Sequence, residues 1–257
     1  MSDKAKSRLM IAGAALCAAL FLFSGAMLAR EYLDQKQSAE AFAEVADLVK
    51  EDVEPPTLEL ADDPAPKPEE LTAFEKYADV YAQNSDLVGW ISIPGTCVDY
   101  PVLQSSADDP EYYLRRTYKG EWRTAGSIFF QWDCSAESQN TVVYGHNMSD
   151  GTMFAVLQKM ADEAFRTEHS KILLQTSNGL REYQIAAVLK TDITKFRFNR
   201  TEFADHADFL SFQKELFAQS LYESQTIHGE DCRLLTLVTC SYEWENARTV
   251  VIAAEVR

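Results

Sequence analysis

One stretch carries the strongest signal in the sequence: Leu235-Thr236-Leu237-Val238-Thr239-Cys240-Ser241-Tyr242-Glu243-Trp244-Glu245-Asn246-Ala247-Arg248. An alternating, β-branched run ends at Cys240, a polar and acidic turn follows, and Arg248 opens a second apolar run over residues 249–254. This pattern predicts two strands joined by a loop. The thiol and the guanidinium would then lie at one end of a sheet, where the cation could stabilise a thiolate or a developing oxyanion.

A nucleophilic thiol also needs a proton acceptor, and His146 is the best candidate. It lies in Tyr144-Gly145-His146-Asn147-Met148, at the end of an apolar run and before a polar turn. Strand ends and glycine-flanked turns are where a scaffold presents reactive groups. The other histidines, His169, His206 and His228, lie among polar residues and are interpreted as structural. A Cys/His pair predicts nucleophilic acyl transfer, whereas residue type alone would equally allow an inert core cysteine.

The N-terminus resembles a membrane anchor. Residues 9–29 carry no charge, and about 20 apolar residues suffice to cross a bilayer as a helix. Three basic residues lie in the preceding segment 1–8, and the following segment is acidic, so we expect a cytoplasmic N-terminal tail and an external domain. A cleaved signal peptide is the alternative, because Ser24-Gly25-Ala26 offers small residues at a plausible cleavage site. Both interpretations export the rest of the chain.

Residues 30–70 are strongly acidic, with 13 acids and 4 bases, and residues 51–70 contain five prolines. We expect helix over 31–50 and an extended linker over 51–70, together forming an extracellular stalk. The whole chain of 257 residues has a net charge of −16, which argues against a nucleic-acid partner.

The catalytic domain is expected at 71–257. An amphipathic helix is predicted over 71–84, short helices near 153–165 and a longer helix over 203–222. About eight short strands are predicted between and after these helices, which favours a mainly β fold with a closed or nearly closed barrel. The predicted strands cover 90–93, 97–103, 127–130, 141–144, 171–175, 182–191, 235–240 and 248–254.

The remaining cysteines are too sparse for a disulfide scaffold. Cys17 lies inside the apolar segment, and Cys97, Cys134 and Cys232 are scattered through the domain. A single bridge, for example between Cys97 and Cys134, stays open. Because no closely spaced Cys/His set occurs, we expect no structural zinc site.

The motifs resemble those of sortases, the cysteine transpeptidases of Gram-positive cell surfaces. Residues 236–240, Thr-Leu-Val-Thr-Cys, match the sortase Thr-Leu-x-Thr-Cys signature. The histidine segment 144–148 with Asp150-Gly151-Thr152-Met153-Phe154 is similar to class B sortases in particular. Gly89-Trp90-Ile91 and Asp99-Tyr100-Pro101-Val102 also look like class B sequences. The resemblance covers roughly residues 71–257.

The resemblance implies an eight-stranded sortase barrel with an N-terminal helix and a long helix before the last two strands. Cys240 would be the nucleophile, His146 the general acid/base, and Arg248 the residue that holds substrate and stabilises the tetrahedral intermediate. Four neighbours would flank the substrate groove: Tyr144, Thr239, Ser241 and Tyr242. The site needs no metal and no cofactor. Class B sequences often have an acidic residue two positions before the arginine; this place is Asn246, so Glu243 or Glu245 could supply the charge instead.

The implied partners are surface proteins with an Asn-Pro-x-Thr-x sorting signal, and an amine acceptor on a peptidoglycan precursor or a pilin. The membrane would be bound through the N-terminal helix. Two alternatives stay open: an exported cysteine peptidase that hydrolyses the same kind of signal, and a catalytically silent module that binds it. Product analysis with and without an added amine would separate the first from a transpeptidase.

Overall fold

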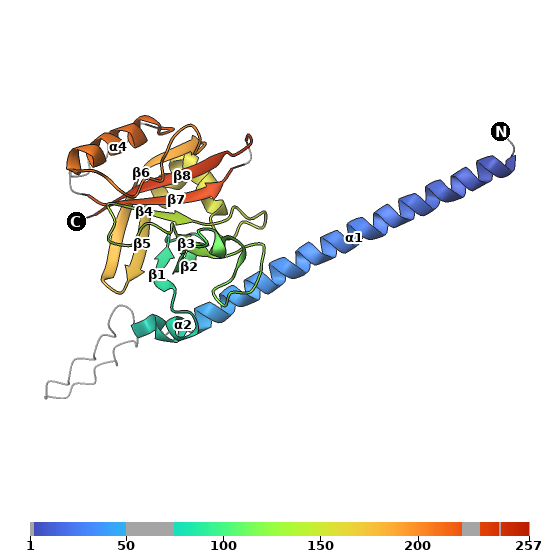
Figure 1. Cartoon of the computed structure of the whole chain (residues 1–257), viewed down its shortest axis with the longest axis horizontal. Coiled ribbons are helices and arrows are strands. Elements are labelled where there is room, and N and C mark those ends of the chain that lie inside the picture. Colours follow the sequence, from blue (N-terminus) through green and yellow to red (C-terminus); the bar gives the residue numbers. More distant parts are fainter. Residues whose placement is uncertain (1–2, 50–74, 223–231, 242, 257) are drawn as a thin grey trace.

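Eight strands close into a barrel in the computed structural model, which describes residues 3–49, 75–222, 232–241 and 243–256 (Figure 1). The order around the barrel is β1-β2-β3-β4-β7-β8-β6-β5, and β5 pairs with β1 to complete it. The closed eight-stranded barrel predicted from the sequence is therefore confirmed. The strands are β1 Leu87–Ser92, β2 Asp99–Gln104, β3 Ile128–Phe130, β4 Asn140–Tyr144, β5 Lys171–Thr176, β6 Gly179–Thr191, β7 Leu234–Cys240 and β8 Arg248–Glu255.

Two of the eight strand pairs, β2–β3 and β4–β7, are parallel. The β4–β7 pair joins the histidine strand to the cysteine strand, and its register sets Tyr144 opposite Val238. In β7 every residue except Cys240 is buried, because one face fills the barrel and the other is covered. Strands buried on both faces appear in the sequence as nearly continuous apolar runs.

Short helices connect the strands and cover the barrel. They are η1 Glu75–Tyr77, α2 Ala78–Gln83, η2 Tyr112–Arg115, η3 Ala155–Ala161, α3 Glu163–Glu168 and α4 His206–Ala218. The helix predicted over 203–222 is thus present but shorter. It starts after Asp205, whose carboxylate accepts a hydrogen bond from the backbone N–H of Asp208, a typical N-cap. Phe209, Phe212 and Leu216 pack its apolar face onto the core.

The first helix, α1 Asp3–Asp47, is continuous and projects far beyond the barrel (Figure 1). Its C-terminal part packs against the barrel, a contact that the sequence analysis did not predict. Phe42 meets the ring of Tyr100 edge-on with centroids 5.2 Å apart, and Val45 is buried. The helical part of the predicted stalk is therefore docked onto the barrel. The proline-rich segment 51–70 and the predicted helix start at 71–74 lie outside the described residues.

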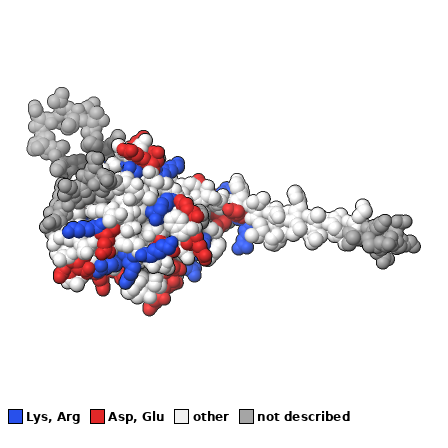
Figure 2. Space-filling model, turned by 90° about the horizontal axis from the view of Figure 1, so that it is seen from above, with Lys and Arg blue, Asp and Glu red and all other residues white. Residues whose placement is uncertain are grey.

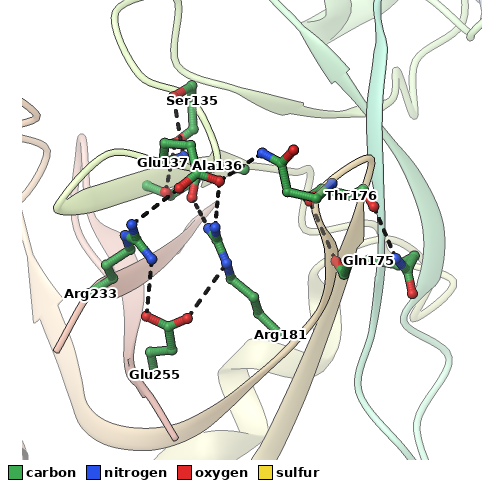
Figure 3. A network of polar contacts seen from close by, with 11 residues as sticks. Ser135, Ala136, Glu137, Gln175, Thr176, Arg181, Arg233 and Glu255 are labelled. Carbon is green, nitrogen blue, oxygen red and sulfur yellow. Dashed lines mark hydrogen bonds and ion pairs between the residues drawn. The ribbon is translucent and has the colours of Figure 1, made fainter. Parts of the chain in front are cut away.

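An ion-pair network ties the strands together near the barrel end where β7 begins (Figure 3). Glu137 binds both Arg181 of β6 and Arg233, which precedes β7. Glu255 of β8 pairs with the same two arginines, at 3.5 Å and 3.6 Å. Arg181 and Glu255 are largely shielded from water, which strengthens their attraction relative to an exposed pair.

Candidate active site

Cys240 and Arg248 are directly opposed at the end of the β7–β8 ladder. Such opposed residues in an antiparallel pair have Cβ atoms roughly 4.5–5.5 Å apart, so their side chains can act on the same group. Both residues line a cavity of about 800 Å³, as does His146. The structure thus brings the three predicted catalytic residues to one site.

His146 reaches this site through the parallel pairing of β4 with β7. The ladder continues one step beyond β4, because the N–H of Gly145 donates to the carbonyl of Val238 at 3.1 Å. His146 then lies two residues past the pair Tyr144–Val238, as Cys240 does on the other strand. Residue Gly145 also has no room for a side chain, since an added Cβ would come within 2.4 Å of Ile128 Cδ1.

The ring of His146 is held by the loop before β3. Its Nε2 donates to the carbonyl of Leu114 at 2.6 Å. A carbonyl can only accept, so the neutral ring carries its proton on Nε2 and leaves the Nδ1 lone pair free to take a proton. Burial, opposed in part by this hydrogen bond, lowers the pKa of His146 below its usual 6.5, and the nearby Arg115 lowers it further. The imidazole is therefore neutral at neutral pH.

The main chain of Cys240 is fixed by two side-chain amides. Its carbonyl accepts hydrogen bonds from Asn147 Nδ2 and Gln158 Nε2, each at 3.0 Å. Gln158 is in turn fixed through Oε1, which accepts from Thr249 Oγ1 at 2.9 Å and from the ammonium of Lys190. Gln158 lies in η3 and does not line the cavity, so it positions the nucleophile from outside the cavity, through the backbone carbonyl of Cys240.

Part of the cavity wall is a hydrogen-bonded chain of polar side chains. The hydroxyl of Tyr144 donates to Gln131 Oε1 at 2.9 Å, and Asn199 Nδ2 donates to the same oxygen at 3.0 Å. Burial raises the pKa of Tyr144 to about 12, so its phenol stays neutral. Both charge types line the cavity, with a slight positive excess in an otherwise acidic protein: the arginines Arg115, Arg197, Arg200 and Arg248, and the acids Glu111, Asp133 and Glu202.

The predicted groove residues have different positions. Tyr144 and Thr239 line the cavity. Ser241 does not: it is buried, and its hydroxyl points to Glu243 and to Lys190 Nζ, which is 3.0 Å away. Tyr242 lies outside the described residues. Asn246 has φ of 63° and is exposed, and asparagine is one of the few residues that adopt this conformation readily, so its role here is to turn the chain.

Several cavity residues were missed by the sequence analysis. Leu114 acts through its backbone, which leaves no signature in the sequence, whereas Gln131 and Asn199 belong to no motif and lie far apart in the chain. The sulfur atoms of the five cysteines are free of disulfides, so the Cys97–Cys134 bridge is absent. Cys134 is buried, which raises the pKa of its thiol to about 12. The described residues contain no cluster of three or more His, Cys, Asp or Glu side chains suited to a metal ion.

Comparison with known proteins decides the family. Residues 91–256 match the sortase domain family. Sortase B of Listeria monocytogenes is 39% identical over 182 residues, which cover 69% of this chain and 72% of that protein. The chain belongs to the sortase family. Sortase B of Staphylococcus aureus is 33% identical over 67% of this chain and 71% of the relative, and class B is thereby confirmed.

Solved structures agree with the barrel of this sortase. Sortase B of Bacillus anthracis in complex with AAEK1 superimposes with a TM-score of 0.72, at 29% identity, over 88% of this chain and 99% of that one. The Staphylococcus aureus sortase B–substrate complex gives a TM-score of 0.65 at 32% identity, over 71% of this chain and 85% of that one. The protein is accordingly a sortase-type cysteine transpeptidase.

Proposed function

We propose that this sortase cleaves a C-terminal sorting signal of the Asn-Pro-x-Thr-x type and transfers the protein to a cell-wall or pilin amine. The observation that carries the proposal is the convergence of Cys240, Arg248 and His146 on one cavity at the β7–β8 end of the barrel. A Staphylococcus aureus sortase B that has been solved as a substrate complex supports a substrate-binding role for this family member.

The first chemical step forms a thioester. The Cys240 sulfur attacks the carbonyl carbon of the signal threonine, while its proton passes to Nδ1 of His146, the free nitrogen of the ring. Collapse of the tetrahedral intermediate breaks the C–N bond, and His146 returns the proton to the leaving amine. Arg248, opposite Cys240, is placed to bind the oxygen on which negative charge develops.

The second step resolves the thioester with an acceptor amine. The amine nitrogen attacks the acyl carbon, loses a proton to His146 and displaces the Cys240 thiolate, which recovers that proton. Asp133, Glu111 and Glu202 also line the cavity, and their carboxylates could attract a cationic acceptor such as a protonated amine before it loses its proton.

The N-terminal helix would anchor the enzyme. Among the described residues one helix, Ala12–Asp47, is long and apolar enough to cross a membrane. Its large apolar side chains between residues 16 and 28 are exposed, for example Phe21 at 80%, and exposed apolar surface of this extent needs a bilayer or a partner. With basic residues at 4, 6 and 8, the catalytic domain would lie outside a Gram-positive cell as a single-pass membrane protein.

Incubation of the enzyme with an Asn-Pro-x-Thr peptide tests the reaction. We expect intact-mass analysis to show a thioacyl adduct on wild type and on Cys97→Ala, an exposed cysteine outside the cavity, but not on Cys240→Ala. An added amine should yield a transfer product. Adduct on Cys240→Ala would contradict the assignment of the nucleophile. Hydrolysed product alone at high amine would favour the peptidase alternative, and an unreactive Cys240 would favour the silent binding module.

A further inference from the structure

Because α1 is docked onto the barrel, it fixes the height of the barrel above the membrane; this inference rests on the membrane anchor proposed above. The uncharged segment ends at Ala29, and five residues later Asp34 of α1 makes a hydrogen bond to the domain. Five helical residues span about 7.5 Å. The headgroup layer on one side of a bilayer is roughly 5–8 Å thick. The first domain residues beside the helix therefore lie at the outer edge of the headgroups.

The domain segment at this height is 112–124, which consists of η2 and the loop after it and is here called the membrane-proximal loop. The N–H of Thr124 donates to Asp34 Oδ2 at 3.2 Å, and Lys119 pairs with Glu44. Because Glu44 lies ten residues further along α1, or about 15 Å, the Thr124 end of the loop is the end nearer the apolar segment. The loop is ordered by its own pairing, with Arg116 bridged to Trp122.

The exposed side chains of this loop suit a lipid surface. Trp122 is 53% exposed, although tryptophan is costly to leave in water, and tryptophan is enriched at membrane interfaces. Arg115 is exposed and Arg116 half-buried, and neither has a carboxylate within ion-pair distance among the described residues. On α1 itself, Arg30 and the exposed Tyr32 lie at the matching level. Figure 2 shows the long uncharged stretch of α1 that leads to this level.

We propose that the membrane-proximal loop lies on the headgroups of an anionic bilayer, with Trp122 inserted at the interface and Arg115 and Arg116 bound to lipid phosphates. The same loop contributes Leu114 and Arg115 to the catalytic cavity and holds His146. The end of the barrel where β7 ends and β8 begins also faces the N-terminal part of α1 (Figure 1). The groove mouth is therefore next to the bilayer surface.

Fluorescence quenching tests this placement with the full chain in nanodiscs of phosphatidylcholine and phosphatidylglycerol that carry brominated acyl chains. We expect part of the tryptophan emission to be quenched, more by bromine near the headgroups than by bromine deep in the bilayer. This quenching should fall strongly in Trp122→Phe and be kept in Trp132→Phe, a cavity tryptophan of similar exposure. Peptide cleavage in detergent should be unchanged in Trp122→Phe, because Trp122 does not line the cavity.

The charge of the lipid gives a second measurement. Removing phosphatidylglycerol should weaken the quenching, and Arg115→Gln/Arg116→Gln should make it independent of lipid charge. The matched control is Arg233→Gln, near the opposite end of β7. If the chain enters nanodiscs but Trp122→Phe is quenched as strongly as wild type, the loop placement is wrong while the anchor stands. If the chain does not enter nanodiscs, the anchor and the loop placement both fail.

Discussion

Leu114 holds the ring of His146 through a single hydrogen bond, from Nε2 to the backbone carbonyl at 2.6 Å. This bond determines the tautomer, and burial lowers the pKa of the ring. We expect ¹⁵N NMR to show the Nε2–H tautomer for His146 and a pKa below 6.5. His169 is an internal reference, because its Nδ1 lies 3.0 Å from the carbonyl of Pro94, which requires the opposite tautomer when the ring is neutral.

The lowered pKa of His146 also predicts a pH dependence of stability. Below about pH 6.5 the unfolded chain binds a proton at this position more readily than the folded chain. The contribution of His146 to the free energy of unfolding is therefore complete above pH 6.5 and decreases as pH falls through the folded pKa. We expect the stability difference between wild type and His146→Gln to shrink at acidic pH in urea titrations. A difference that stays constant from pH 7 to pH 5 would contradict the lowered pKa.

Gly145 is required by the packing beneath the histidine. An added Cβ would lie 2.4 Å from Ile128 Cδ1 and 2.7 Å from Phe154 Cδ2. We expect Gly145→Ala to reduce the free energy of unfolding by about 1–3 kcal/mol and to lower activity by displacing His146. Adding Ile128→Val removes the closer of the clashing atoms and should recover part of both losses. No recovery in the double variant would contradict this steric explanation.

Gln158 is expected to act on turnover and not on substrate affinity. Gln158→Glu keeps an acceptor for Lys190 and Thr249 but cannot donate to the carbonyl of Cys240. We predict a loss of about tenfold or more in kcat with little change in KM or in stability. Gln158→Leu should in addition cost about 1–3 kcal/mol, because it takes the acceptor from the buried Thr249 hydroxyl and removes one hydrogen bond each from Lys190 and Cys240.

A matched control is Gln175→Leu, whose side-chain amide binds only the adjacent carbonyl of Thr176 in the pairs that the structure describes. Its effect on kcat should be small. An unchanged kcat in Gln158→Glu, or an equal loss in Gln175→Leu, would show that the hydrogen bond to Cys240 does not position the nucleophile.

The network of Figure 3 should contribute more to stability than an exposed ion pair. Arg181→Ala removes the arginine that joins Glu137 to Glu255 and leaves the shielded Glu255 with Arg233 as its ion-pair partner. We expect a loss of about 1–3 kcal/mol in guanidinium unfolding. Lys171→Ala breaks the half-exposed pair with Glu182 and should cost less than about 1 kcal/mol. Similar losses in both variants would contradict the role of burial.

The barrel and the convergence of the site could be predicted because strands leave periodic signals and the cysteine, histidine and arginine lie at strand ends. Cys240 and Arg248 are close in sequence, so their pairing follows from a hairpin. The relation of His146 to Cys240 is different: residue type and strand-end position made His146 the best candidate for the base, but the parallel pairing of two distant strands that brings the two together left no local signal.

Other features left no local signal. The contact of Phe42 with Tyr100 joins a helix and a strand, and sequence periodicity predicts each of them without reference to the other. The pattern of an amphipathic helix does not reveal which surface its apolar face covers. Gln158 looks like an ordinary surface residue of a short helix until Thr249 and Cys240 are placed around it. Asn246 stands where class B sequences often have an acidic residue, and its role in turning the chain could not be foreseen, because its positive φ is a property of the loop backbone.

The parallel pairing of β4 with β7 has a consequence for how this chain can vary. Base and nucleophile are aligned mainly by main-chain hydrogen bonds between these two strands, and within the long segment that separates them Asn147 and Gln158 fix the carbonyl of Cys240. Connections in that segment that make none of these contacts, for example the turn between β5 and β6, can lengthen, shorten or be exchanged without altering the chemistry. One residue inserted within either strand would instead shift a reactive group by about 3.3 Å and turn it to the other face of the sheet. The enzyme should therefore tolerate diversity in its loops and almost none in the length of these two strands.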